Sequence, residues 1–354
     1  MIVEEGSVKI YVPEEQPEKG PGRAVSGFYN RSQKLNRDVT LSLLSAVRPR
    51  VVLDGFSGTG VRAIRIGREL GLRVVAADTD RVACRLSEEN ARANGVDLEV
   101  LNESFNCVVE RFSFDYIDID PYGSCVPFAD AALRCVRNGG ILGITVTDLT
   151  ALTGSSPRKT RRRYGSSVIN DELRHESGIR VLLGYLARRA ASYDRAIEPI
   201  LSFWHSHYYR VFIRVREGAA LADRCLSNVG MFNRKHHLLS FYGDIDEGPL
   251  WVAGMNDPAF LGRMDRSFLD RNGNRLLDTL LHEDSMPYFI EAVHLARHLR
   301  LSLPPISSFI DEIERAGAQA YRTHLSPTGV KVKGGAGTES VIVAYRNALS
   351  SGGV

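Results

Sequence analysis

The sequence predicts an α/β protein whose first part is a parallel sheet with helices on both faces, followed by a smaller α+β unit. Two observations predict the sheet: short apolar runs alternate with helical patterns as far as Val146, and a Gly-rich turn directly follows the first run. This alternation stops beyond Glu217, where a second unit begins. Because 354 residues with 44% hydrophobic side chains can form two cores, we expect domains at residues 1–217 and 218–354.

The apolar runs define the order of the elements in the first part. Five of them are expected to form parallel strands, at residues 47–54, 72–77, 98–101, 114–119 and 140–146. Helical periodicity predicts helices at residues 59–70, 127–137 and 171–192. Two further runs, residues 197–204 and 208–215, are separated by a few polar residues and predict an antiparallel hairpin. Five parallel strands closed by a hairpin at one edge are typical of the Rossmann-like sheet of class I methyltransferases.

The second part is less regular. Helical patterns at residues 285–299 and 305–316 precede a Gly-rich segment at 326–343 that we expect to form a hairpin. Two helices followed by a β-wing predict a winged-helix-like module. The segment 224–271 has no clear periodicity and receives no assignment.

The composition is that of an ordinary soluble protein, and a local excess of positive charge predicts a polyanionic partner. The first twenty residues hold five glutamates and no apolar segment, and no apolar run approaches ~18 residues, so neither a signal peptide nor a membrane span is expected. Residues 158–216 contain 13 lysines and arginines against 5 aspartates and glutamates, which favours nucleic acid as a partner. No obligatory protein partner is apparent. The cysteines show neither the spacing of zinc ligands nor that of a disulfide framework, so a reducing cytoplasm is expected. They are Cys84, Cys107, Cys125, Cys135 and Cys225.

A Gly-rich turn follows the first expected strand. Gly58 and Gly60 lack a Cβ, so the backbone can approach a ligand closely. Glycine spacing alone does not distinguish a dinucleotide-binding turn from one that binds S-adenosylmethionine, because the dinucleotide pattern tolerates an alanine such as Ala63 at its third glycine position. Asp54 ahead of the turn favours S-adenosylmethionine, whose amino group it can meet, and Asp78 after the second strand is placed to bind ribose hydroxyls. The alternative is that both aspartates cap the following helices.

A second turn, Asp120–Cys125, follows the fourth expected strand and therefore lies beside the cofactor turn, at the carboxyl ends of the strands. Asp120 can accept an N–H hydrogen bond from a nucleobase amine and then its proton, while Tyr122 stacks on the base. This combination predicts methyl transfer to an amine without a metal. The alternative is a plain tight turn, since Asp, Pro and Gly all favour one.

These residues belong to a series of stretches that resembles the tRNA (guanine-26 N2) dimethyltransferases of archaea and eukaryotes, over most of the chain. The matching stretches are Gly27–Asn30, Leu35–Asp38, Asp118–Ser124, Tyr164–Gly165, His175–Glu176 with Arg180, Pro199–Ser202, His207–Arg210, Gly248–Trp251, Thr323–His324 and Pro327–Lys331. The resemblance implies transfer of one or two methyl groups from S-adenosylmethionine to N2 of guanine 26 in tRNA. It does not fix whether one or two methyls are added.

The resemblance also implies roles for individual residues. Asp120 is expected to be the base, and Phe28 and Tyr122 to hold the flipped guanine between their rings. Arg37, Arg62 and Asp78 are expected to contact S-adenosylmethionine. The full set of expected cofactor contacts comprises Arg37, Asp54, Gly58, Arg62, Asp78, Ser104 and Phe105, of which Phe105 is equally a candidate core aromatic. The basic segment 158–163 reads as a loop, from which Arg158, Arg161 and Arg162 are expected to contact phosphates.

Three departures from the family pattern stand out. Many members carry four zinc-binding cysteines ahead of the Gly248–Trp251 stretch, whereas residues 224–247 contain only Cys225, so an archaeal type without zinc is expected. Ser104–Phe105 replaces the more usual Asp-Ala pair, and Tyr122 the usual Phe.

Two other functions compete with this one. Methyl transfer to adenine N6 or to a protein amide uses a turn with a second proline, which Tyr122 replaces here. A catalytically silent RNA-binding protein is disfavoured by the intact Asp54, Gly58, Gly60, Asp78 and Asp120.

Overall fold

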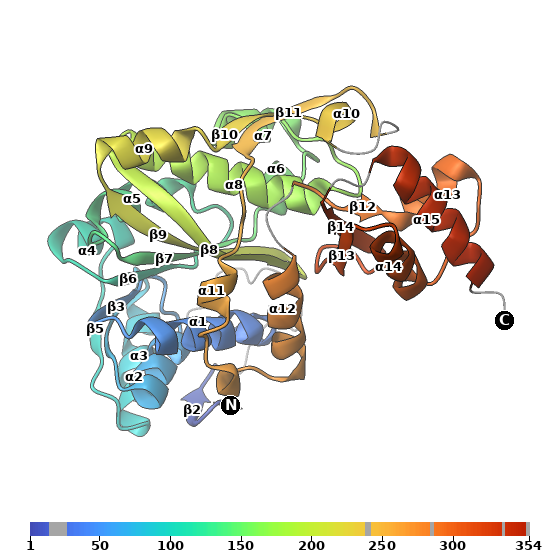
Figure 1. Ribbon diagram of the computed structural model, residues 1–354. Helices are drawn as coiled ribbons and strands as arrows, with labels where there is room; N and C mark the ends of the chain where they lie inside the picture. Colours follow the sequence, from blue (N-terminus) through green and yellow to red (C-terminus); the bar gives the residue numbers. More distant parts are fainter. Residues whose placement is uncertain (14–26, 238–241, 284–286, 335–336, 352–354) are drawn as a thin grey trace. The chain divides into compact units, whose positions relative to one another are not determined.

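The computed structural model describes residues 1–13, 27–237, 242–283, 287–334 and 337–351, which form two compact units (Figure 1). Unit 1 comprises Met1–Asp148, Leu186–Leu226 and Ala259–Arg275. Unit 2 comprises Leu149–Tyr185, Ser227–Pro258 and Leu276–Val354. The units are interleaved along the chain, whereas the sequence predicts one boundary after residue 217. The assignment of catalysis to residues 1–217 and of tRNA binding to 218–354 stays a prediction.

Unit 1 is built on a seven-stranded sheet in the order β5-β4-β3-β6-β7-β9-β8. The first five of these are parallel, and β9 pairs antiparallel with both β7 and β8, as the sequence predicts. The strands are β3 Val51–Asp54, β4 Arg73–Ala77, β5 Glu99–Leu101, β6 Tyr116–Ile119, β7 Ile141–Val146, β8 Arg195–His205 and β9 Tyr208–Glu217. The Rossmann-like methyltransferase sheet is thus confirmed. Because the chain leaves β3 for β4 on one side and β6 lies on the other, the topological switch point falls between β3 and β6.

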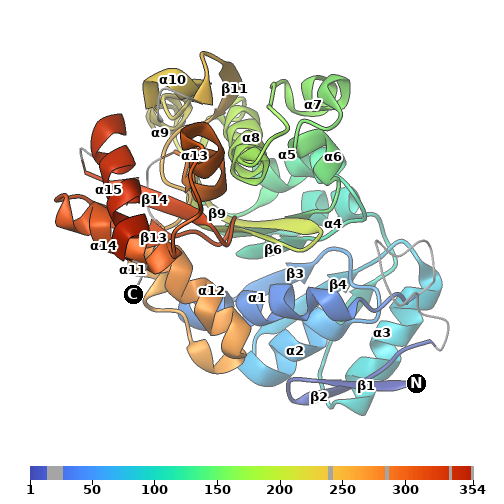
Figure 2. The same ribbon diagram turned by 90° about the vertical axis from the view of Figure 1, so that its right-hand side faces the viewer.

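Helices cover both faces of this sheet. Helices α1 (Lys34–Val47), α2 (Val61–Leu70) and α3 (Arg81–Ala93) lie on one face, and α4 (Phe105–Arg111) and α5 (Val126–Cys135) on the other (Figure 2). Local signals explain their ends: the side chain of Asp80 accepts the Val82 N–H at the start of α3, and Gly71 ends α2 in the left-handed conformation.

The sequence reasoning missed the N-terminal part of unit 1. A hairpin of β1 (Ile2–Glu5) and β2 (Val8–Tyr11) precedes helix α1. Its inward side chains form a small core with Tyr29 and α2, so it is an integral part of the unit. Helix α1 also takes up Val47, so β3 begins four residues later than expected. Helix α9 (Ala219–Leu226) and the 3-10 turns Arg31–Gln33 and Arg266–Phe268 also belong to unit 1.

Unit 2 contains a module in the predicted order of helix, helix and β-hairpin. Strands β12 (Ile290–Glu291), β14 (Gly329–Lys333) and β13 (Gln319–Arg322) form an antiparallel sheet in that order. Helices α13 (Ala292–Leu299) and α14 (Ile306–Arg315) connect β12 to β13. The hairpin was predicted too far along the chain, because residues from Thr338 onward form helix α15 (Thr338–Ser351). Four side chains spaced as on one helix face are buried there: Val341, Ala344, Tyr345 and Ala348. Residues 285 and 286, the start of the expected first helix, lie outside the described residues.

The unassigned middle segment forms the hairpin of β10 (Val229–Asn233) and β11 (Asp246–Trp251), with the short helices α10 (Arg234–His237) and α11 (Pro258–Leu261). Helices α8 (Arg174–Ala191) and α12 (Arg271–His282) each run from one unit into the other.

The basic segment 158–163 is a helix and not the expected loop. It lies in α7 (Pro157–Tyr164), which follows the short α6 (Leu149–Leu152). Pro157 is compatible with a first helical turn, and Gly165 ends the helix with φ 58°. Thr160 and Tyr164, four residues apart, are buried, so the helix packs one face and leaves another in solvent.

Candidate active site

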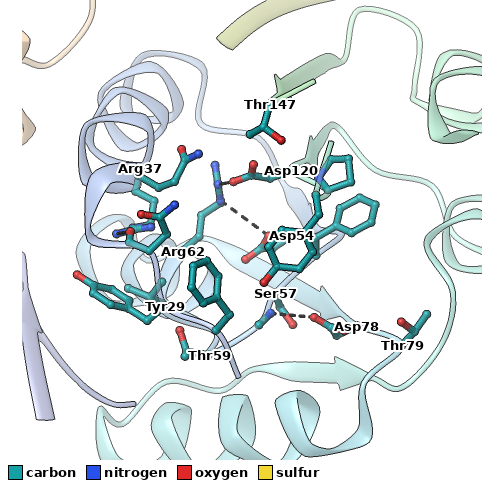
Figure 3. Close-up of a pocket in the computed structure, with 18 of the residues that line it drawn as sticks. Tyr29, Arg37, Asp54, Ser57, Thr59, Arg62, Asp78, Thr79, Asp120 and Thr147 are labelled. Carbon is teal, nitrogen blue, oxygen red and sulfur yellow. Dashed lines mark hydrogen bonds and ion pairs between the residues drawn. The ribbon is translucent and has the colours of Figure 1, made fainter. Parts of the chain in front are cut away.

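A cavity of about 400 Å³ opens in unit 1 where β3, β4 and β6 end (Figure 3). This is the switch point of the sheet, where α/β proteins bind their ligands. Residues from both predicted turns line the cavity, including Asp54, Gly58, Asp78, Asp120 and Tyr122. Phe28, Arg37 and Arg62, which precede or flank these turns, line it as well. The structure thus brings eight of the predicted site residues together.

Hydrogen bonds to the Asp78 side chain connect the Gly-rich turn to the end of the neighbouring strand β4. The N–H of Gly58 donates to Asp78 Oδ2 at 2.9 Å, and the N–H of Asp80 donates to Asp78 Oδ1 at 2.9 Å. Gly58 has φ +51°, and a Cβ there would lie 3.1 Å from the carbonyl oxygen of Phe28. Only glycine therefore fits without strain at this point of the cavity wall.

Several buried polar atoms around the turn have no hydrogen-bond partner among the described residues. They are Asp54 Oδ2, Ser57 Oγ and Thr59 Oγ1. All three residues line the cavity. Buried polar groups are almost always paired, so these atoms indicate a polar ligand that completes the site. An amino-acid moiety such as that of S-adenosylmethionine fits this set of donors and acceptors.

Arg62 lies at the centre of a buried cluster of carboxylates (Figure 3). Its Nη2 forms an ion pair with Asp120 Oδ2, its Nη1 lies 3.0 Å from Asp118 Oδ1, and its Nε lies 3.9 Å from Asp54 Oδ1. Burial raises the pKa of Asp54 to about 7; Arg62 lowers it only in part, and the nearby Asp118 and Asp120 raise it further. Asp118 is fully buried and also pairs with Arg210 at 2.5 Å, which fits a structural role.

Asp120 stands at the rim of the cavity. Its side chain is 17% exposed, so the ion pair with Arg62 leaves it accessible to an incoming base. The turn after it is fixed to the end of the neighbouring strand β7: the N–H of Gly123 donates to Thr147 Oγ1 at 2.8 Å, and the N–H of Thr147 donates to the Gly123 carbonyl at 2.9 Å. Asp120 is therefore a preorganised carboxylate beside the cavity.

Phe28 and Tyr122 contact each other across the mouth of the cavity. Their ring centroids are 5.8 Å apart and the ring planes are inclined by 54°. A base stacked between them needs about 7 Å, twice the ordinary contact distance of roughly 3.5 Å. The two rings must therefore move apart and align before they can hold a base. Tyr122 is 61% exposed, which is compatible with such a movement.

Ser104 and Phe105 do not line the cavity. Phe105 is buried and stacks on Phe56 at 5.4 Å, with Phe128 packed edge-on against Phe56 at 4.8 Å. Phe56 and Phe128 line the cavity, so Phe105 supports its wall from behind. The sequence offered no signal for Phe128, which lies in helix α5, directly after the turn Asp120–Cys125.

Two further lining residues escaped the sequence reasoning. Thr147 directly follows β7, and His207 lies in the turn between β8 and β9. Its Nε2 is buried and has no partner among the residues that the structure describes.

Arg158, Arg161 and Arg162 lie in unit 2, on α7. All three are exposed, and their spacing of three and four residues places them on one face of the helix. This face is opposite the buried Thr160 and Tyr164. No ion pair or hydrogen bond to a described residue engages their guanidinium groups.

Metal-binding clusters and membrane-spanning helices are absent from the described residues. They contain no group of three or more His, Cys, Asp or Glu side chains able to hold a metal ion. Glu176, beside His175, is instead buried against Arg180 at 2.8 Å and Lys331 at 2.7 Å. None of the described helices is long and apolar enough to cross a membrane.

Comparison with known proteins places the chain in a family. Residues 6–346 match the family model described as N2,N2-dimethylguanosine tRNA methyltransferase. The tRNA (guanine(26)-N(2))-dimethyltransferase of Thermoplasma volcanium is 44% identical over 94% of this chain and 95% of its own, and that of Thermoplasma acidophilum is 46% identical over 94% of each. Trm1 from Pyrococcus horikoshii, solved with S-adenosyl-L-methionine, is 30% identical and superposes with a TM-score of 0.85 over 97% of this chain and 99% of that one. The chain therefore belongs to the N2,N2-dimethylguanosine tRNA methyltransferase family.

Proposed function

We propose that this protein transfers one or two methyl groups from S-adenosylmethionine to the exocyclic N2 of guanine 26 in tRNA. The observation that carries the proposal is the accessible carboxylate of Asp120, which lines the cavity together with the Phe28–Tyr122 ring pair. Membership of the family supplies the substrate. We propose the cytoplasm as its location, since tRNA is the substrate.

The residues of the cavity suit the parts of S-adenosylmethionine. The Arg37 guanidinium fits the carboxylate, and Asp54 with the unpaired Ser57 and Thr59 hydroxyls fits the ammonium group. Asp78, already an acceptor for backbone N–H groups, fits the ribose hydroxyls. Because Ser104 and Phe105 lie off the cavity, we assign the adenine to Phe56 and Phe128. When bound, S-adenosylmethionine supplies an electrophilic methyl group.

The chain's own groups make the amine reactive. Asp120 accepts an N–H hydrogen bond from N2 of guanine, which orients the amine, and takes the proton as the new N–C bond forms. Arg62 fixes the position of the carboxylate by its ion pair. Phe28 and Tyr122 hold the base plane and exclude water, which offsets part of the cost of flipping the base.

Binding of the cofactor's ammonium group requires an ionised Asp54 carboxylate. Since its pKa is about 7, Asp54 is largely protonated at about pH 6 and largely ionised at about pH 8. S-adenosylhomocysteine, which keeps the ammonium group, should therefore release close to one proton from the protein on binding at the lower pH and almost none at the higher. Calorimetry in two buffers of different ionisation enthalpy measures this release. Asp54→Asn should abolish it, and proton exchange that is equal at both pH values would contradict the role.

The exposed arginine face of α7 should bind tRNA phosphates. Each phosphate contact contributes about 0.7–0.9 to the slope of log affinity against log salt. Replacing Arg158, Arg161 and Arg162 together by Gln should lower this slope by about 2 and weaken tRNA binding on the order of tenfold at low salt. Filter binding over a salt series measures both quantities.

A matched control removes the same charge from unit 1. Arg73, Arg81 and Arg85 are exposed there, and their joint replacement by Gln should leave the slope nearly unchanged. Equal losses from the two triple variants would mean that only net charge matters.

The substrate class is tested by competition. The protein is incubated with methyl-labelled S-adenosylmethionine and equal masses of tRNA, duplex DNA and a protein mixture. The proposal expects label in tRNA alone. Label in DNA would favour adenine N6 as the acceptor, label in protein an amide, and no label a silent RNA-binding protein.

A further inference from the structure

A buried cluster of charged groups ties the first strand of the chain to one wall of the cavity. Glu5, the last residue of β1, is 2% exposed. Its Oε1 accepts from Arg37 Nε at 2.7 Å and its Oε2 from Arg37 Nη2 at 2.6 Å. Oε2 also accepts from the hydroxyl of Tyr29 at 2.7 Å. Glu5 does not line the cavity itself, but Arg37 and Tyr29 do.

This clamp fixes the Arg37 guanidinium in one plane. A bidentate carboxylate uses two of the three guanidinium nitrogens and determines where the third one points. Nη2 gives a second hydrogen bond to the Asn30 carbonyl at 3.1 Å, and the guanidinium lies 5.1 Å from the Tyr29 ring centroid. Nη1 has no partner among the described residues, so it is the part of Arg37 left for a ligand.

Glu5 is itself anchored from the other side. Arg65 Nη1 donates to Glu5 Oε1 at 2.9 Å and to Asp38 Oδ1 at 2.6 Å. Burial alone would raise the pKa of Glu5, but the charge and hydrogen bond of Arg37, with help from Tyr29 and Arg65, hold it at about 2. The carboxylate is thus ionised throughout the physiological range, and the clamp persists.

The charges of the cavity leave Arg37 as the natural partner of an anion. Asp54, Asp78 and Asp120 all line the cavity and repel a carboxylate. Arg62, the other arginine there, is already occupied by three carboxylates. The carboxylate of S-adenosylmethionine is its only anionic group, so it needs a guanidinium N–H that is not yet engaged, and Arg37 Nη1 offers one.

We propose that Glu5 is a positioning residue for the cofactor: it holds Arg37 so that Nη1 meets the carboxylate of S-adenosylmethionine. This inference rests on the proposed function. It predicts that losing the clamp weakens only ligands that carry the carboxylate. S-adenosylhomocysteine carries it, whereas 5′-methylthioadenosine has the same nucleoside without the amino-acid part.

The test compares Glu5→Gln with Glu4→Gln in the full-length protein. Glu4 is on the same strand but exposed, where it pairs with Lys9 at 3.3 Å. By calorimetry, Glu5→Gln should weaken S-adenosylhomocysteine on the order of tenfold and change 5′-methylthioadenosine by less than about twofold. Glu4→Gln should change neither. In the methylation assay, the KM for S-adenosylmethionine should rise while kcat and the KM for tRNA stay close to the wild-type values.

Two results would overturn the inference: unchanged affinity for S-adenosylhomocysteine, or an equal loss for both probes, which would indicate general damage. If Glu5→Gln fails to fold, Glu5→Asp decides, because it keeps the charge but cannot reach both Arg37 nitrogens. A folded Glu5→Asp protein that binds both probes like the wild type refutes the clamp. Failure of the wild type to bind either probe would instead refute the proposed function.

Discussion

Asp120→Asn should lower kcat for tRNA methylation by ~10³-fold, within the range that a positioned general base contributes. The amide keeps the shape of the carboxylate but cannot take a proton from the guanine amine. It also gives up the ion pair with Arg62, which still has Asp118 at 3.0 Å as a partner, so the fold should survive. Binding of S-adenosylhomocysteine should change by less than about threefold, since the variant leaves the other lining residues in place.

The measurement is single-turnover methylation of tRNA, with calorimetry on the same preparation. Asp130→Asn on helix α5 is a suitable control, because Asp130 pairs with the partly exposed Arg189 and does not line the cavity. If Asp120→Asn methylates within twofold of the wild-type rate, another group removes the proton.

Arg62→Met should lower the free energy of unfolding by about 3–5 kcal/mol. The substitution leaves Asp54, Asp118 and Asp120 close together without their shared cation. Removing one partner of a buried charge cluster costs far more than the cluster's net contribution, because the remaining charges stay buried. Methylation should also be lost, since Asp120 loses the group that orients it.

The loss should depend on pH in a defined direction. Burial already raises the pKa of Asp54, and without Arg62 it loses the positive charge that lowers it, so the folded variant holds a proton on Asp54 that the unfolded chain releases. Stability of the variant then falls as pH rises, and the deficit should be larger at about pH 8 than at about pH 5. Urea unfolding at both pH values measures it. Arg68→Met, an exposed position on the same helix, is the control. A deficit below about 1 kcal/mol would show that Arg62 is not needed to balance the cluster.

The sheet was predictable because its signals are local. Buried parallel strands read as short apolar runs, and turns such as Asp54–Gly60 and Asp120–Cys125 mark their carboxyl ends. The same reasoning missed the β1–β2 hairpin, whose short strands are buried only through contacts with Tyr29 and α2. It also read 158–163 as a loop, because six polar residues show no apolar periodicity; the two residues that pack α7, Thr160 and Tyr164, give little signal.

The sequence predicts which residues form the site better than it predicts the contacts between them. Family resemblance and position after strands identified Asp54, Asp78 and Asp120, all of which line the cavity. Local sequence carries no sign that Arg62 is shared by three carboxylates or that Glu5 clamps Arg37, since these pairs join residues far apart in the chain. For Phe105 the sequence left two roles open, adenine contact and core aromatic; in the structure it is buried, stacks on Phe56 and does not line the cavity.

The most direct test of the central claim maps the methyl group on tRNA. Purified protein is incubated with S-adenosylmethionine and an unmodified tRNA transcript, and with the same transcript carrying adenine at position 26. We predict N2-methylguanosine or N2,N2-dimethylguanosine at position 26 of the first transcript and no methylation of the second. Methylation that persists in the second transcript, or a methyl group on any atom other than guanine N2, would contradict the account.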